Sequence, residues 1–173
     1  SSIPYAMHAD EYTARHLWET SGKDGVINYF IDKKGVYGMH VKMPRGSNKF
    51  IAQSLKSINE NTSLVFKKSK MKNADLILGS VSKYKHAHYQ YEDWGGSSAW
   101  IKHKKRGSKM SVEDKVGASY QIGNVLGLIL THKTIGIYDF TDSVMAYDFN
   151  YENFNGFTQS DFITIDKIWS TLS

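Results

Sequence analysis

The side chains best suited to metal chemistry are two histidines in the middle of the chain. His86 and His88 are separated by one residue, so an extended segment would place both imidazoles on one face. His103 or Asp93 could join them, because imidazole and carboxylate groups are ordinary zinc ligands. A single His-x-His pair is a weak signal. The sequence therefore predicts no metal site, and His86 and His88 stand as its weak candidates.

Three carboxylates farther along could do acid–base work. Asp139, Asp142 and Asp148 lie close together in the sequence, and neighbouring carboxylates can transfer protons. The same stretch is rich in Asn and Asp, which also form solvated turns by bonding to their own backbone. The chain has no cysteine nucleophile, no Gly-x-Ser-x-Gly turn and no P-loop, so the chemistries that these motifs support are not expected.

A polar pair interrupts an otherwise apolar helix pattern. The stretch YQIGNVLGLIL runs from Tyr120 to Leu130, with branched apolar residues at helical spacing. Gln121 and Asn124 stand where a core helix would not need polar groups, and the segment SVMAY follows at 143–147. These residues indicate that the helix and the segment after it position a functional site.

This stretch resembles the active-site helix of the metzincin zinc peptidases, whose pattern is H-E-x-x-H-x-x-G-x-x-H followed by a Met-turn. The chain keeps the wording of serralysin- and matrixin-like members at residues 122–123 and 126–128. SVMAY resembles the Met-turn, with Met145 as its methionine, and FTQSDFITIDKIW is similar to the family's C-terminal helix. The likeness covers most of the chain from about Val26 onward.

The resemblance implies that the zinc chemistry has been lost. Tyr120, Asn124 and Leu130 stand at the three histidine positions, and Gln121 stands at the position of the catalytic glutamate. Zinc in such a site needs three imidazole nitrogens, and a glutamine cannot act as a general base. Zinc is therefore not expected as a cofactor, and neither is metal-dependent proteolysis. Tyr147, at the place of the Met-turn tyrosine, is expected to hydrogen-bond to Asn124 or Gln121.

Ordinary packing explains Gly127 well and is the favoured explanation of Met145. A glycine such as Gly127 ends a helix without the steric penalty of a Cβ. A methionine such as Met145 fills an irregular gap in a core.

Periodicity and turn residues predict the elements that position this helix. Helices are expected at 9–20, 47–62, 111–129 and from 158 onward, and strands at 26–32, 63–68, 74–81 and 98–104. Residues 83–98 are polar and aromatic with two glycines, and are predicted to form an exposed loop. The segment 98–104 alternates apolar and basic residues, which is typical of an edge strand.

Three helix starts carry capping signals. Ser47 is expected to cap the second helix. Ser111 with Asp114, and Thr158 with Asp161, have the spacing of a capping box.

These elements predict an α/β or α+β fold with a twisted, mostly parallel sheet and an antiparallel edge strand. The sheet is expected to pack on an N-terminal helix, an active-site-type helix and a C-terminal helix. We expect one metzincin-like domain over 1–173, with a helical extension at 1–25, the sheet and helices at 26–130, and the Met-turn region and last helix at 131–173. A chain of 173 residues with 40% hydrophobic residues can bury a core.

The positive charge is concentrated in two runs. The net charge is +5, and the excess lies in KKSKMK (67–72) and KHKKRGSK (102–109). Such runs could meet an anionic partner, but solvated loops flanking strands are the favoured explanation. No apolar run approaches the length of a membrane span, and no nucleic-acid partner is expected.

The leading functional expectation is a catalytically inactive, peptidase-like domain that binds a protein or peptide or serves as a structural part of an assembly. Metzincin clefts take an extended peptide beside an edge strand, and this requires no zinc. The resemblance therefore places a binding side at five consecutive residues, with Trp94 as a further aromatic contact: Ala99, Trp100, Ile101, Lys102 and His103.

Two alternatives remain open. A divergent secreted metallopeptidase or another hydrolase would cut unfolded protein in a chelator-sensitive way. A module that binds anionic partners through its basic loops would lose affinity steeply with salt. The family resemblance also implies a secreted or extracellular, bacterial-type protein.

Overall fold

The structure of the chain is a computed structural model, and it describes residues 11–82, 89–91, 96–102, 109–128, 134–135, 138–139, 143–146 and 149–172. Its elements follow in the order α1 (Glu11–Thr20), β1 (Val26–Asp32), α2 (Ser47–Asn61), β2 (Val65–Lys68), η1 (Met71–Asn73), β3 (Leu76–Val81), β4 (Tyr89–Tyr91), β5 (Ser97–Lys102), α3 (Val112–Val125), β6 (Thr134–Ile135), β7 (Tyr138–Asp139), η2 (Tyr151–Asn153) and α4 (Gln159–Ser170).

The main sheet has the strand order β2-β1-β3-β5-β4. The first four of these strands are parallel, and β4 runs antiparallel to β5. The predicted mixed α/β fold with a mostly parallel sheet is therefore confirmed, and its antiparallel strand is β4. All six residues of β3 are buried, as expected for an apolar strand in the interior of a parallel sheet. The strands β6 and β7 form a separate two-stranded sheet.

The edge of this sheet is not where the sequence pattern placed it. β5 pairs with β3 on one side and with β4 on the other, over Ser97–Ala99. The prediction that 98–104 forms the edge strand is therefore wrong. The edge strand is β4, which lies inside the segment predicted to be a loop. Strand order depends on tertiary pairing, and alternating lysines do not reveal it.

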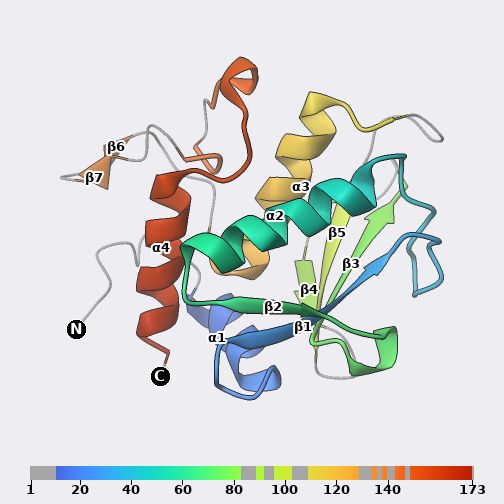
Figure 1. Cartoon of the computed structure of the whole chain (residues 1–173), viewed down its shortest axis with the longest axis horizontal. Helices are drawn as coiled ribbons and strands as arrows, with labels where there is room; N and C mark the ends of the chain where they lie inside the picture. Colours follow the sequence, from blue (N-terminus) through green and yellow to red (C-terminus); the bar gives the residue numbers. More distant parts are fainter. Residues whose placement is uncertain are drawn as a thin grey trace.

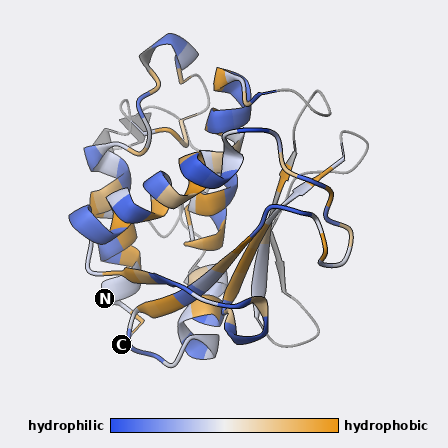
Figure 2. Ribbon diagram, turned by 45° about the vertical axis from the view of Figure 1, so that its right-hand side comes forward, coloured by the Kyte–Doolittle hydropathy of each residue, from blue (hydrophilic) through white to orange (hydrophobic). Residues whose placement is uncertain are grey.

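The helices cover the sheet and one another. In Figure 1, α2 and α3 lie side by side above the strands, and α4 stands near the end of α2, where Asp166 accepts hydrogen bonds from the N–H and the hydroxyl of Ser63. Figure 2 shows the apolar colour concentrated along β1 and β3, and polar colour on the outward sides of the helices. The buried core draws on all of these elements, through residues such as Ile27, Leu55, Leu78, Ile122 and Ile165.

The two capping boxes form as predicted. In α3 the Ser111 hydroxyl accepts a hydrogen bond from the Asp114 backbone N–H, and the Asp114 carboxylate accepts one from the Ser111 N–H. Thr158 and Asp161 make the same reciprocal pair at the start of α4. The predicted Ser47 cap is wrong. The N-cap of α2 is Gly46, in the left-handed region with φ 88°, and it supplies no side-chain cap.

The helix α3 ends earlier than its apolar pattern predicts. It stops at Val125, and Gly127 adopts a φ of 100°. A left-handed glycine after the last turn redirects the chain without the penalty that a Cβ would bring. Leu126 and Leu128 therefore lie beyond the helix.

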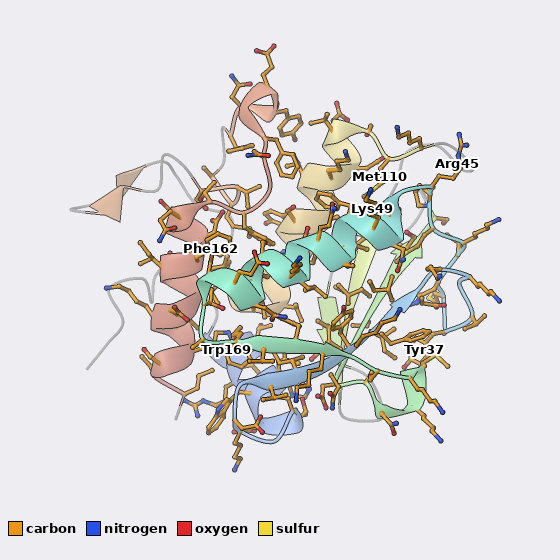
Figure 3. All side chains as sticks on the ribbon, in the orientation of Figure 1. Tyr37, Arg45, Lys49, Met110, Phe162 and Trp169 are labelled. Atoms are coloured by element: carbon orange, nitrogen blue, oxygen red, sulfur yellow. The ribbon has the colours of Figure 1, made fainter. Side chains whose placement is uncertain are left out.

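The last helix packs as predicted. Phe162, Ile165, Ile168, Trp169 and Leu172 are all buried, and Figure 3 shows Phe162 and Trp169 on α4. The Trp169 indole N–H donates to the Leu126 carbonyl at 3.1 Å, which ties α4 to the end of α3. None of the helices in the described ranges is both long and apolar enough to cross a bilayer.

Candidate functional site

The polar pair on α3 lies at the edge of the core. Gln121 is 7% exposed, and its Oε1 has no hydrogen-bond partner among the described residues. Tyr120 is half-buried and packs against the core, and Asn124 is half-buried. Leu130 lies outside the described residues. The structure therefore brings Tyr120, Gln121 and Asn124 together on one helix. Tyr147, the expected hydrogen-bonding partner of Asn124 or Gln121, also lies outside the described residues.

Met145 packs directly beneath this helix. It is buried, and a Cβ added to Gly123 would lie 2.8 Å from its Sδ atom. The Met145 N–H donates to the Ser143 hydroxyl at 3.0 Å, and that hydroxyl donates to Asp161 at 2.6 Å. The capping carboxylate of α4 thus holds the segment that carries Met145 against α3.

Asp161 is the most heavily used carboxylate in this part of the molecule. It is 1% exposed and accepts hydrogen bonds from the Ser143 hydroxyl, the Val144 N–H, and both the N–H and the hydroxyl of Thr158. Burial is the largest influence on its ionisation and raises the pKa of Asp161, while these hydrogen bonds act in the opposite direction. The geometry gives this group a structural role and no route to a substrate.

The binding residues predicted on β5 divide into two groups. Ala99 and Ile101 are buried members of the core, so their side chains cannot meet a ligand. Trp100 and Lys102 belong to β5, but only their backbone is described. The other predicted residues lie outside the described part of the chain: Trp94, His103, His86 and His88. Within the ranges that the structure does describe, no three His, Cys, Asp or Glu side chains are grouped as metal ligands.

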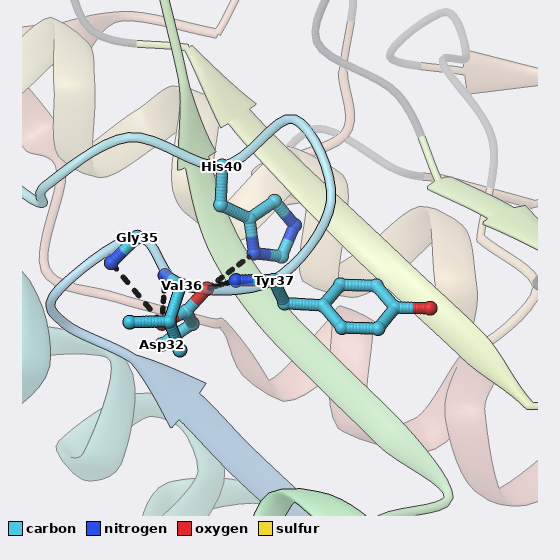
Figure 4. A network of polar contacts seen from close by, with 5 residues as sticks. All are labelled: Asp32, Gly35, Val36, Tyr37 and His40. Atoms are coloured by element: carbon cyan, nitrogen blue, oxygen red, sulfur yellow. Dashed lines mark hydrogen bonds and ion pairs between the residues drawn. The ribbon is translucent and has the colours of Figure 1, made fainter.

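A second polar network, which the sequence reasoning missed, lies at the end of β1. Asp32 is 1% exposed, and its Oδ1 accepts from the N–H groups of Gly35 and Val36 at 3.1 and 3.0 Å. Its Oδ2 accepts from the Tyr37 N–H at 2.9 Å and from Nδ1 of His40 at 2.8 Å. Figure 4 shows the loop wrapped around this single carboxylate.

The His40 ring occupies space that a side chain of the sheet would otherwise fill. A Cβ on Gly79 of β3 would overlap the imidazole, and the Tyr37 ring lies 5.5 Å from it, centroid to centroid. Burial alone raises the pKa of Asp32, but the hydrogen bonds from Val36, Tyr37 and His40 and the charge of His40 lower it below its ordinary value. A buried aspartate at the end of a strand, followed by a glycine-containing loop, was the available signal.

The two outer strands of the sheet, β2 and β4, differ in whether their outward backbone groups are hydrogen-bonded to other described residues. At the β2 end, the Asn59 side chain of α2 accepts from the Phe66 N–H at 2.6 Å and donates to the Phe66 carbonyl at 3.0 Å. It pairs with Phe66 as a neighbouring strand would. The exposed side chains of Lys67 and Lys68 flank this position, and lysines discourage edge pairing. The β2 edge is therefore closed at Phe66.

The register shows which groups of β4 point away from the sheet. The Ser97 N–H donates to the Asp75 carbonyl at 3.0 Å, on the β3 side. Because backbone groups alternate along a strand, Ser98 faces β4, and its partner Gln90 faces β5. The N–H and C=O groups of Tyr89 and Tyr91 therefore point outward.

Comparisons with known proteins show the fold alone. No family model matches the chain, and no curated protein matches it. Among solved structures, 37 chains match. One is a chain of a structure described as the GM1-bound form of the ECX AB5 holotoxin, with a TM-score of 0.58 and 10% identity, covering 88% of this chain and 82% of that chain.

These comparisons correct the family assignment made from the sequence. No family model or curated protein supports a metzincin, and the solved chain described above belongs to an AB5 holotoxin. Membership of the metzincins is therefore not upheld. The serralysin likeness, the degenerate zinc motif and the Met-turn are withdrawn with it. The chain has a mixed α/β fold that it shares, at low identity, with a chain of a holotoxin.

Proposed function

We propose that the chain is a binding module that takes an extended peptide by strand addition on the outer edge of β4. In this mode main-chain hydrogen bonds supply affinity, and no catalytic group is required. The observation that carries the proposal is the contrast between the two ends of the sheet. Asn59 closes the β2 edge at Phe66, whereas the alternation along β4 directs the backbone groups of Tyr89 and Tyr91 outward.

The position of the site differs from the one expected from the sequence. Ala99 and Ile101 are core residues, and β4 covers β5 over Ser97–Ala99. The proposed site is therefore one strand farther out. A peptide lying antiparallel or parallel to β4 would extend the five-stranded sheet by one strand.

The test uses peptides of about ten residues selected on the folded chain from a random display library, with affinities measured by calorimetry. Tyr91→Pro removes an outward N–H, and Tyr91→Ala removes only the side chain. We expect the proline variant to bind at least about threefold more weakly than the alanine variant, because one backbone hydrogen bond is lost. Equal affinities, or no selected peptide, would reject strand addition at β4.

The fold of each variant must be checked independently. Tyr91→Pro leaves the pairing of Gln90 with Ser98 unchanged, so its circular dichroism spectrum and melting temperature should resemble those of Tyr91→Ala. Gln90→Pro serves as the disruptive reference, because it removes an N–H that faces β5.

An extracellular location accompanies this proposal. It is supported by the fold shared with a chain of a holotoxin. Detection of the chain in the culture supernatant of its native host, and its absence from washed cells, is the expected result. A signal confined to the cell lysate would contradict it.

A second candidate is the binding of an anionic surface, favoured by a cluster of basic residues near the start of α2. The backbones of Arg45 and Lys109 form an isolated parallel β-bridge. The Met110 N–H donates to the Arg45 carbonyl at 3.2 Å. Figure 3 shows Arg45, Lys49 and Met110 in this one region. The first turn of α2 carries no acidic residue. Affinity for heparin that falls steeply with salt supports this candidate, and a salt-independent interaction rejects it.

A further inference from the structure

We propose that a cavity between α2, the first turn of α3 and residues 154–157 binds a ring compound that carries one carboxylate and at least one hydroxyl group. This site is distinct from the β4 edge and independent of the proposed peptide binding. The cavity has a volume of about 350 Å³, within the range of pockets that hold small molecules. Among its lining residues, Phe50, Ser54 and Ser57 come from α2, Lys115 comes from α3, and Phe154 and Asn155 come from the segment before α4.

The apolar wall of the cavity suits a flat ring. The Phe50 and Phe154 rings lie 6.1 Å apart, centroid to centroid, with a tilt of 43°. Phe149 supports Phe154 from behind in an edge-on contact at 6.4 Å. These three side chains pack against the core while remaining partly exposed. A ring compound can therefore cover aromatic surface that the protein itself leaves open.

The charge of the cavity selects an anion. Lys115 is half-buried, and its Nζ lies 5.9 Å from the centroid of the Phe50 ring. In the part of the chain that the structure describes, no carboxylate lies within 4.0 Å of this nitrogen. Because a partly buried ammonium group gains most from an anionic partner, the ligand is expected to place its carboxylate here.

The two serine hydroxyl groups in the cavity can bond a ligand only if the ligand supplies a hydrogen-bond donor. The Ser54 hydroxyl, in a buried side chain, donates to the Phe50 carbonyl at 2.9 Å. The Ser57 hydroxyl donates to the Ser54 carbonyl at 2.6 Å. Since both hydroxyl protons are used within α2, the oxygens can only accept. A ligand hydroxyl meets this requirement, and the exposed amide of Asn155 can pair with either kind of group.

This chemistry is shared by sugar acids and by phenolic carboxylates, so the experiment uses one probe of each kind. D-glucuronate and 4-hydroxyphenylacetate are titrated into the ¹⁵N-labelled chain, with D-glucose and 4-hydroxyphenylacetamide as neutral counterparts. We expect one of the acids to shift the amide signals of Ser54, Ser57, Lys115 and Gly156 at concentrations up to about 20 mM. The neutral counterpart should bind about tenfold more weakly.

Lys115→Met keeps the aliphatic stem on Phe50 and removes the charge, and it should weaken the acid about tenfold. Lys56→Met is the matched control, because Lys56 is an exposed residue of α2 outside the cavity. Asn155→Ala, at an exposed position, provides a second variant that leaves the core intact. The proposal is overturned if neither acid shifts these signals, if the neutral probes bind equally well, or if both lysine variants behave alike.

Discussion

Gly123 of α3 and Met145 are packed so closely that a Cβ on the glycine would lie 2.8 Å from the methionine Sδ. The same Cβ would lie 3.4 Å from Leu128 Cδ1. Met145 is itself held by the chain of hydrogen bonds that runs through Ser143 to Asp161. The glycine is therefore required by the packing and not by its backbone conformation.

Gly123→Ala should destabilise the chain by about 1–3 kcal/mol, because the added methyl group would overpack the buried Met145 side chain. Urea denaturation measures the effect. Gly117→Ala on the same helix is the matched control, since nothing lies within 4 Å of its added Cβ. It should stabilise the helix by about 0.5–1 kcal/mol. If both variants shift the free energy of unfolding in the same direction, the close packing is refuted.

Ser47→Ala should leave stability unchanged or raise it. The Ser47 hydroxyl is buried and has no hydrogen-bond partner among the described residues, so removing it relieves an unsatisfied group. Ser111→Ala should instead cost about 0.5–2 kcal/mol, because it removes a capping hydrogen bond. Thermal melts of the two variants give the comparison. A loss at Ser47 as large as the loss at Ser111 would mean that Ser47 has a polar partner after all.

Asp161→Asn should change how stability depends on pH. Burial raises the pKa of Asp161 above its ordinary value of 3.8. Since the folded pKa is above the unfolded one, the stability that this carboxyl contributes is fully present below pH 3.8 and is lost as pH rises through the folded pKa. Relative to Asp161→Asn, the wild-type chain should therefore lose stability as pH rises through this window. Urea unfolding at a series of pH values tests the sign, and a gain over the same interval would contradict it.

Asp32→Asn should show the opposite pH dependence. The pKa of Asp32 is lowered in the folded chain, so its contribution is present above the unfolded pKa of 3.8 and is lost as pH falls through the folded pKa. The variant should be less stable by about 1–3 kcal/mol at neutral pH, because an amide nitrogen cannot accept from two of the four donors. The difference from wild type should shrink in acid. A difference that grows in acid would show that the hydrogen bonds do not favour the ionised form.

Asn59→Ala should open the β2 edge. The loss of both hydrogen bonds to Phe66 should cost about 1–2 kcal/mol and expose outward backbone groups to another chain. Light scattering should then detect concentration-dependent association. Asn61→Ala is the control, because in the described part of the chain its side chain donates within α2, to the Ser57 carbonyl. A variant at Asn59 that stays as monodisperse as the one at Asn61 would show that the edge is protected by other means.

Much of the local structure follows from the sequence. The strand β1 coincides with the predicted range 26–32. Its β-branched and aromatic residues, bounded by turn residues, favour a strand over other local structures. The two capping boxes also form as predicted. Both signals are local: each depends on residues within a single element or a single turn.

The site depended on information that is not local. β4 was hidden because Tyr89–Tyr91 is polar and aromatic and owes its strand pairing to β5. The Asp32–His40 pair joins residues whose proximity depends on a loop folding back onto Gly79. The helix α3 was over-extended because apolar spacing continues past Val125, whereas Gly127 changes the direction of the chain.

Most surface loops accept insertions readily, and Val36, 65% exposed at the tip of the loop after β1, would look like an inviting place to graft an epitope or a tag. The Asp32 carboxylate makes that choice a poor one. Its two oxygens accept hydrogen bonds from residues at fixed positions in the loop, namely 35, 36, 37 and 40. The last of these, His40, places its imidazole in the space beside Gly79 of the sheet. One inserted residue would move some of these donors away from the carboxylate, so grafting should be directed elsewhere on this scaffold.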